Sequence, residues 1–377
     1  MSDTEELEDI INNDDEFDAW IEQALNEDKD DVEEEDKSDE IDYTSEEEIE
    51  ELLVKPPSDL DIEDMHPLQK EMFKNIKTMD KSSWMRGEGI DTQYPKLNEK
   101  LSGIQPGLAL LGAHSNTGKT SFLMSIAKGV GEVNDDVYGL YIGLDDPFQD
   151  ILPRIVANKQ KIPINAIRQP ASYIEWDNLI EKRNEGIRDV LYNNIDSFKV
   201  IDKNNIKNLA QLKEVIKEHY NYCDEIGKKL FVAIDSFHDI EIEENFRTSD
   251  EKWNELPKRL SDFADNMEIP IWCTAELKKT DFSKFRPDQN DIKFASKIAF
   301  EAKLILILYN EVGLESGDAS IYYTSDQFPG KMPVLEVRFE KNKLSSYKGN
   351  LYYEFIPQYA HFEESETERY DSLLYSD

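Results

Sequence analysis

The sequence predicts an α/β fold in which a mainly parallel, twisted sheet is flanked by helices and preceded by an acidic, disordered tail. Three observations support this prediction. From Gly89 onward, short apolar segments alternate with longer amphipathic ones, as in parallel strands joined by crossover helices. The segment AHSNTGKT at 113–120 lies between an apolar and an amphipathic segment, where a phosphate-binding loop belongs. A second apolar segment, 230–234, is followed by Asp235.

Strands and helices alternate along residues 89–358, which we expect to form one domain. Apolar segments predict strands over 108–111, 137–144, 198–201, 230–234, 269–274, 302–309 and 335–339. Amphipathic segments predict helices over 119–130, 148–158, 208–223, 250–267 and 295–301. The stretch 147–207 is longer than a plain crossover and leaves room for a surface of its own.

The segments on either side of this domain differ from it in composition. Residues 1–66 hold 30 Asp and Glu against 3 Lys, so residues 1–60 cannot offset their ordering entropy and should be disordered. Residues 61–88 should form a linker with a helix near 68–79. Residues 359–377 should form a second acidic tail.

The N-terminal tail contains one helical pattern, in which Phe17, Trp20, Ile21, Ala24 and Leu25 share a face. Two explanations stay open: the segment folds onto a partner, or the pattern arose by chance in acidic sequence. The tail as a whole could recruit a basic protein, mimic nucleic acid, or serve solubility.

Composition narrows the function classes. The net charge of −38 argues against tight, nonspecific binding to nucleic acid, so any DNA contact must use local basic loops. Cys223 and Cys273 lie in apolar segments and predict core residues, with no disulfide framework. The five histidines lack ligand spacing, so the only metal expected is Mg²⁺ that arrives with a nucleotide. No apolar run is long enough to cross a bilayer and no signal segment is evident, which favours a soluble, cytoplasmic protein.

The loop at 113–120 carries the strongest signal, although Ala113 stands where Gly is commoner. Its N–H groups and the following helix N-terminus should converge on phosphate oxygens. Lys119 would reach the β and γ phosphates, Thr120 would ligate Mg²⁺, and Gly118 would let the backbone approach. A chance match would leave an ordinary turn here. The predicted nucleotide contacts are His114, Ser115, Asn116, Thr117, Gly118, Lys119, Thr120 and Ser121.

Two carboxylates at strand ends complete the predicted site. Asp235 would hold the magnesium through water, or else simply begin a loop. Asp145 follows the strand predicted over 137–144 and is the candidate base that activates water. The alternative is that Asp145 and Asp146 cap the helix that begins at Phe148.

Taken in order, these motifs resemble the motor domain of DnaB-type replicative helicases, within the RecA-like superfamily of P-loop NTPases. GIDTQYPKL at 89–97 and LSGIQPG at 101–107 are similar to the lead-in that precedes the family's P-loop. The resemblance continues to about residue 356 and implies a RecA-like core that binds ATP and Mg²⁺. It also implies a homo-oligomeric ring, such as a hexamer, that acts on single-stranded DNA during replication.

The resemblance assigns further roles. Asp145 stands where the family has its catalytic Glu, and Asp235 stands at the family's Walker B aspartate. Glu276, in IPIWCTAELK at 269–278, occupies the place of a glutamine that reads the γ-phosphate. Lys341 and Lys343, in EKNK at 340–343, are similar to a Lys-x-Arg pair that completes the neighbouring subunit's site.

Three of these positions depart from the family pattern. The side chain of Asp145 is one methylene shorter than the family's catalytic Glu, and small displacements of a catalytic group lower rates steeply. Glu276 places a negative charge where a phosphate would be read. Lys343 keeps the charge of an arginine finger but loses its two-pronged geometry. Nucleotide binding is therefore a safer expectation than fast hydrolysis.

Single-stranded DNA would be held by loops after the Walker B and sensor strands. The loop after 276 contains Lys278, Lys279, Lys284 and Arg286, which are the candidate DNA contacts. The alternative is a solvated loop that binds nothing. The loop after Asp235 is acidic and would repel phosphate.

Three functions remain open. The first is a DnaB-type ATP-dependent DNA helicase motor, in a pared-down form that would suit a phage. The second is a RecA-like ATP-binding protein with weak or no hydrolysis that controls assembly or partner exchange in replication or recombination. The third is a single-domain recombination mediator.

Overall fold

The computed structural model describes residues 65–84, 89–175, 177–193, 196–242, 249–278, 286–314, 319–345 and 347–366. The chain divides into two compact units, Met1–Gly87 and Glu88–Asp377. In the first unit, helix α4 (Pro67–Trp84) exposes Leu68 and Met72. The predicted acidic tail over 1–60 lies outside the described residues. Among the described residues, no helix is both long enough and apolar enough to cross a bilayer.

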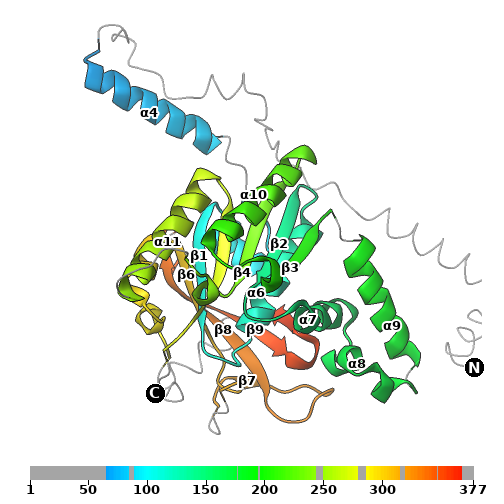
Figure 1. The fold of residues 1–377 in the computed structure, drawn as a ribbon. Helices are drawn as coiled ribbons and strands as arrows, with labels where there is room; N and C mark the ends of the chain where they lie inside the picture. The colour runs from blue at the N-terminus through cyan, green and yellow to red at the C-terminus, as the bar shows by residue number, and fades with distance from the viewer. Residues whose placement is uncertain are drawn as a thin grey trace, which may run out of the picture. The chain divides into compact units, whose positions relative to one another are not determined.

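The second unit is built on a ten-stranded sheet (Figure 1). The strand order is β10-β9-β8-β6-β1-β5-β4-β2-β3, and β7 pairs with β8. The strands are β1 (Gly107–Ala113), β2 (Val137–Gly143), β3 (Phe198–Asp202), β4 (Lys229–Asp235), β5 (Pro270–Glu276), β6 (Leu304–Tyr309), β7 (Tyr322–Tyr323), β8 (Met332–Asn342), β9 (Asn350–Ile356) and β10 (His361–Glu364). Strands β1 to β6 pair in parallel, and β7 to β10 pair antiparallel.

Helices connect and cover these strands (Figure 1). They are α5 (Pro95–Leu101), α6 (Lys119–Val133), α7 (Phe148–Gln160), α8 (Ile164–Arg168), α9 (Asp177–Arg188), α10 (Leu209–Glu225), α11 (Ser249–Asn266) and α12 (Ala295–Glu301). One apolar core joins the sheet to α5, α6 and α7, and another joins it to α10, α11 and α12. Strands β1 and β2 are buried along their whole length because both faces of the sheet are covered.

The predicted α/β class is confirmed, with a mostly parallel sheet between helices. Each predicted strand and helix has a counterpart in the structure, with ends shifted by a few residues. The long stretch 147–207 contains α8 and α9 in addition to α7. The strands β7, β9 and β10 were not predicted.

The start of the expected C-terminal tail at 359 is corrected, because β10 lies beyond it and pairs with β9, His361 opposite Ile356. Phe362 is 2% exposed, and its ring stacks on that of Phe355 with centroids 4.3 Å apart. One buried aromatic side chain thus places this acidic segment in the sheet. Residues 367–377 lie outside the described part of the chain.

The parallel register brings the predicted site residues to one edge of the sheet. Ala113 at the end of β1 is opposite Glu276 at the end of β5. Gly143 at the end of β2 is opposite Asp235 at the end of β4. In open α/β sheets, ligands bind outside the carboxyl ends of such strands.

Candidate nucleotide-binding site

The loop between β1 and α6 has the geometry of an anion site. Helix α6 begins at Lys119, and its N-cap Gly118 has a left-handed φ of 103°. A side chain at Gly118 would place its Cβ 3.2 Å from the Phe355 ring. Glycine therefore satisfies both the backbone angle and the close approach. The first N–H groups of a helix lack partners within the helix and point at whatever lies before it.

The predicted nucleotide contacts surround this helix start. Ser115 and Asn116 are exposed, and His114, Lys119, Thr120 and Ser121 are partly exposed. Thr117 is buried, and its Oγ1 is one of the few buried side-chain atoms among the described residues that have no hydrogen-bond partner. An accessible loop of polar groups with an unsatisfied hydroxyl beneath it fits a phosphate-bearing ligand.

Asp235 lies directly opposite this loop. It is 2% exposed, and its Oδ1 lies 3.9 Å from the Lys119 ammonium nitrogen. Two neighbouring strands supply hydrogen bonds to the carboxylate: Tyr141 donates to Oδ2 at 3.0 Å, and Thr274 donates to Oδ1. A buried carboxylate is stable only with such partners, and these two hydrogen bonds fix its direction.

Tyr141 and Thr274 are site residues that the sequence did not reveal as such. Burial raises the pKa of Tyr141 well above its usual value, and the adjacent Asp235 charge raises it further. The phenol therefore remains a donor. In the sequence, each of the two is marked only by a polar atom within an apolar strand. Their role becomes clear from the sheet register, which places both side chains beside Asp235.

Asp145 lies just after β2, exposed at the same edge. Its main-chain N–H donates to the Asp235 carbonyl at 3.1 Å, which ties the two loops together. Partial desolvation by the surrounding loops, and then the charge of Asp239, raise the pKa of Asp145, whereas Lys119 lowers it. A carboxylate with a raised pKa beside a phosphate site suits a general base.

The alternative capping role of Asp146 is not observed. Its carboxylate pairs with Arg154 at 2.5 Å, and the N-cap of α7 is Pro147, without a side-chain cap. The N–H of Phe148 instead donates to Asp202 at 3.3 Å. Asp202 ends β3, so a carboxylate from the neighbouring strand satisfies this helix start.

Glu276 ends β5 and does not face the loop as an unpaired charge. Its Oε2 accepts a hydrogen bond from the Lys293 ammonium group. That bond first, and the charges of Lys293 and Lys119 after it, hold the pKa of Glu276 below its usual value. His238, for which the sequence predicts no role, accepts the Glu276 main-chain N–H at 3.1 Å.

Lys341 and Lys343 lie where the parallel strands begin, whereas the P-loop of the same chain lies where these strands end. Strand β8 runs antiparallel to β6, so Lys341 is opposite Ile305 at the beginning of β6. The Lys341 ammonium group donates to the carbonyls of Ala299 and Phe300. Burial and the charge of Lys343 lower the pKa of Lys341 to about 8. The structure thus does not bring this pair to its own P-loop.

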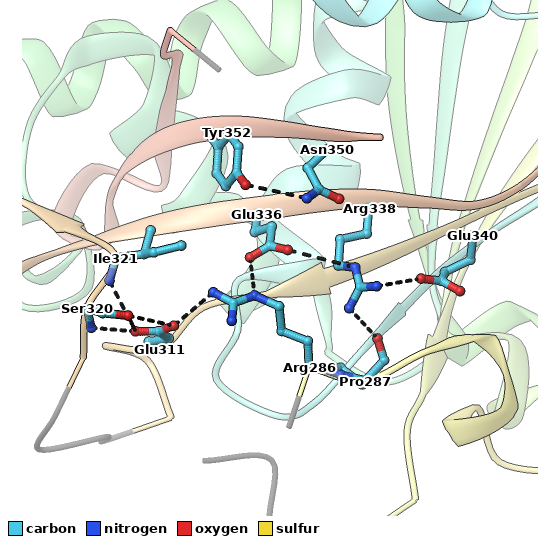
Figure 2. Close-up of polar contacts among 10 residues, drawn as sticks. All are labelled: Arg286, Pro287, Glu311, Ser320, Ile321, Glu336, Arg338, Glu340, Asn350 and Tyr352. Carbon is cyan, nitrogen blue, oxygen red and sulfur yellow. Dashed lines mark hydrogen bonds and ion pairs between the residues drawn. The ribbon is translucent and has the colours of Figure 1, made fainter. Parts of the chain in front are cut away.

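The four predicted DNA contacts have different positions. Lys278 is exposed and donates to the Asn290 carbonyl at 2.8 Å. Lys279 and Lys284 lie outside the described residues. Arg286 is not a free cation: it pairs with Glu336 at 2.8 Å and Glu311 at 3.0 Å (Figure 2).

Comparisons of the sequence identify its relatives. The sequence model of a family described as the DnaB-like helicase C-terminal domain matches residues 89–364. The chain is 22% identical over 251 residues to the replicative DNA helicase DnaB of Buchnera aphidicola subsp. Schizaphis graminum, covering 66% of this chain and 50% of that protein. It is 24% identical over 226 residues to that of Helicobacter pylori, covering 59% and 44%. The chain spans about half the length of these relatives.

Solved structures share the fold. One is an ATPase domain that superposes with a TM-score of 0.65 at 16% identity, covering 80% of this chain and all of that one. Another, a DnaB-like replicative helicase studied with its interactions with primase, superposes with a TM-score of 0.62 at 17% identity, covering 80% and 68%. The RecA-like class of the core is confirmed.

Proposed function

Because the chain belongs to the DnaB-like helicase C-terminal domain family, we propose that it is an ATP-hydrolysing motor that acts on single-stranded DNA during replication. The observation that carries this proposal is the placement of Lys119 3.9 Å from the buried Asp235. Both face the start of a helix that follows a P-loop. This arrangement supplies a cation for phosphate and a fixed carboxylate for its metal.

Each residue then has a defined task. The N–H groups at the start of α6 and Lys119 hold the phosphates, while Thr120 and Asp235 offer oxygens to the magnesium, which prefers oxygen ligands and retains water. ATP brings that magnesium and the phosphoryl group to be transferred. Asp145 accepts the proton of the attacking water.

The lysine pair supports a ring of identical subunits, such as a hexamer. Lys341 is opposite the first residues of β6, whereas the P-loop follows the far end of β1, which runs parallel to β6. Lys341 and Lys343 therefore serve the site of a neighbouring subunit. Lys343 is exposed, as a group that contacts another subunit must be in a single chain.

Single-stranded DNA contacts fall to Lys278 together with Lys279 and Lys284. Backbone phosphates are recognised by cations with little regard to sequence. With a net charge of −38, the chain requires such a local basic site. The acidic segment over 1–60 recruits a basic partner or another replication protein.

A second function is favoured by one observation. At the sensor position, Lys293 pairs with the carboxylate of Glu276. This side chain therefore contacts a lysine of its own chain instead of a phosphate. This arrangement suits a RecA-like protein that binds ATP to control assembly, with little hydrolysis. That function predicts ATP binding with turnover that DNA leaves unchanged.

A subunit-mixing experiment tests the ring. Lys119→Ala and Lys343→Ala proteins should each lack ATPase activity when alone. In mixed rings, an intact P-loop from one subunit meets an intact Lys343 from the next, so part of the activity should return. Absence of recovery, with mixed rings present by native mass spectrometry, would reject completion of the site by a neighbour. Strand separation on a forked DNA duplex, absent in Lys119→Ala, tests the motor itself.

A further inference from the structure

Arg286 is the first described residue after 279–285, and its side chain joins two distant parts of the domain. Its Nε donates to Glu336 Oε2 at 2.8 Å, and its Nη2 donates to Glu311 Oε1 at 3.0 Å. Figure 2 shows the guanidinium group between the two carboxylates. The same group lies 5.2 Å from the centre of the Tyr309 ring. A planar guanidinium is suited to hold two carboxylates at once.

The two glutamates are buried and differ in where they are attached. The Glu336 side chain is 2% exposed and belongs to β8. The Glu311 side chain is 10% exposed and belongs to the turn after β6. Burial raises the pKa of Glu336, and Arg286 opposes that effect. Buried carboxylates need a partner to stay charged, so Arg286 is held firmly in place.

The turn that carries Glu311 packs on the P-loop. Asn310, the preceding residue, donates from Nδ2 to the Thr117 carbonyl at 3.4 Å. A side chain at Gly313 would place its Cβ 2.7 Å from the Asn116 carbonyl oxygen. Such close backbone contact means that the P-loop and this turn cannot shift independently.

Both ends of the basic segment 278–286 are attached to the domain. At its beginning, the Lys278 N–H donates to the Asp291 carbonyl at 2.7 Å. After its end, Arg338 donates to the Pro287 carbonyl at 3.1 Å (Figure 2). Arg286 adds the link that leads to the P-loop turn.

We propose that Arg286 is a positioning residue that couples the end of the basic segment to the nucleotide site through Glu311 and the turn Asn310–Leu314. Nucleotide binding then changes the position or mobility of residues 286–290, and ligands of the basic segment act back on the P-loop. Reciprocity of this kind follows from any coupling between two sites. The DNA side of this coupling rests on the proposed function.

The two glutamates make the proposal testable. Glu311→Gln weakens the link from Arg286 to the P-loop turn, whereas Glu336→Gln weakens a link to β8 alone. Both changes keep side-chain shape and remove one buried charge. Arg286→Lys keeps a charge but loses the two-pronged contact. Arg168→Lys, in the partly exposed pair with Asp150 at 3.0 Å, is the matched arginine control.

Amide hydrogen exchange with and without Mg²⁺ and a non-hydrolysable ATP analogue provides the measurement. In the unmodified chain, nucleotide should change exchange at residues 286–290 by about fivefold or more, the low end of usual coupling. Residues 291–293 are left out because they bond directly to the end of β5. Glu311→Gln and Arg286→Lys should remove that change. Glu336→Gln and Arg168→Lys should retain it. Peptides over 114–122 should respond to nucleotide in every variant, which shows that each variant is folded and binds.

Two outcomes would overturn the proposal: no response at 286–290 in the unmodified chain, or an equal response in Glu311→Gln. If the Arg286→Lys variant fails to fold, the Glu311→Gln variant still tests the proposed coupling. A merely structural cluster predicts that Glu336→Gln, at the more buried site, causes at least as large a loss as Glu311→Gln. This exchange measurement contains no DNA. A lack of DNA-stimulated ATPase activity would therefore reject the proposed function and leave the coupling intact. Loss of the exchange response would reject the coupling and leave the proposed function intact.

Discussion

The imidazole of His238 accepts the main-chain N–H of Glu276 through Nδ1 at 3.1 Å. Its other nitrogen, Nε2, lies 3.2 Å from the Lys293 carbonyl and so carries the proton that it donates there. One neutral ring thus links the loop after β4, the end of β5 and the segment that follows 291. Burial lowers the pKa of His238, in agreement with a neutral ring.

Acidification should therefore destabilise the protein through His238. The folded state holds the ring neutral, while the unfolded state takes up a proton near the ordinary pKa of 6.5. Stability from this group is complete above pH 6.5 and falls as the pH drops from there towards the lowered folded pKa. The slope is at most about 1.4 kcal/mol per pH unit for one proton.

Urea unfolding of the unmodified chain and of His238→Asn between pH 7.5 and 5.5 measures this effect. Asn retains an acceptor near the Nδ1 position and does not titrate. The difference in unfolding free energy between the two proteins should shrink as pH falls. A difference that stays constant with pH would contradict the neutral, buried role of His238.

Removing a donor from Asp235 should weaken magnesium-dependent nucleotide binding. Tyr141→Phe and Thr274→Val each leave the carboxylate one hydrogen bond short. Loss of a partner that orients a metal-binding group typically costs about 10- to 100-fold in affinity. The measurement is nucleotide affinity against Mg²⁺ concentration. Tyr138→Phe is the matched control, since Tyr138 lies on the same strand but packs into the other core; an equal loss there would refute the assignment.

The ATPase rate should depend on the protonation of Asp145. Partial desolvation and the Asp239 charge raise its pKa, so activity should decline on acidification at a higher pH than an ordinary aspartate would allow. Asp239→Asn removes one repelling charge and should move the acid limb to lower pH. Asp145→Asn should lower kcat by about 10²- to 10⁴-fold while nucleotide affinity stays similar. An acid limb that Asp239→Asn leaves in place would exclude Asp145 as the titrating base.

Glu276→Gln should bind ATP more tightly than the unmodified chain. The substitution removes a negative charge that interacts with Lys119 and releases Lys293. A gain of roughly tenfold, or about 1.4 kcal/mol, is expected in a fluorescent-nucleotide titration. Glu255→Gln on α11, in a surface pair with Arg259, is the control. Weaker binding by Glu276→Gln would mean that the carboxylate supports the site.

Local sequence patterns predicted the central sheet because the parallel strands are short, mainly apolar runs. They predicted the P-loop because one segment contains all its parts. Strand β10 was missed because His361, Glu363 and Glu364 hide the single buried Phe362 in acidic sequence. Helices α8 and α9 within 147–207 were missed because α8 is only one turn and a half long and α9 is strongly polar.

Pairings between distant residues could not be predicted in the same way. Asp235 alone indicated a metal site, but its donors Tyr141 and Thr274 reach it only through sheet register. Arg286 was predicted as a DNA contact because the sequence of a basic segment does not show which of its cations points into the domain. Its partners Glu311 and Glu336 lie 25 and 50 residues away, and each is unremarkable by itself.

The central claim is that Lys119 and Asp235 belong to a site whose ATP turnover responds to single-stranded DNA. Steady-state ATPase activity of the full chain, measured with and without single-stranded DNA, tests it most directly. We expect turnover that DNA stimulates and that Lys119→Ala abolishes. Nucleotide binding with no turnover in either condition would contradict the motor and leave the ATP-binding regulator.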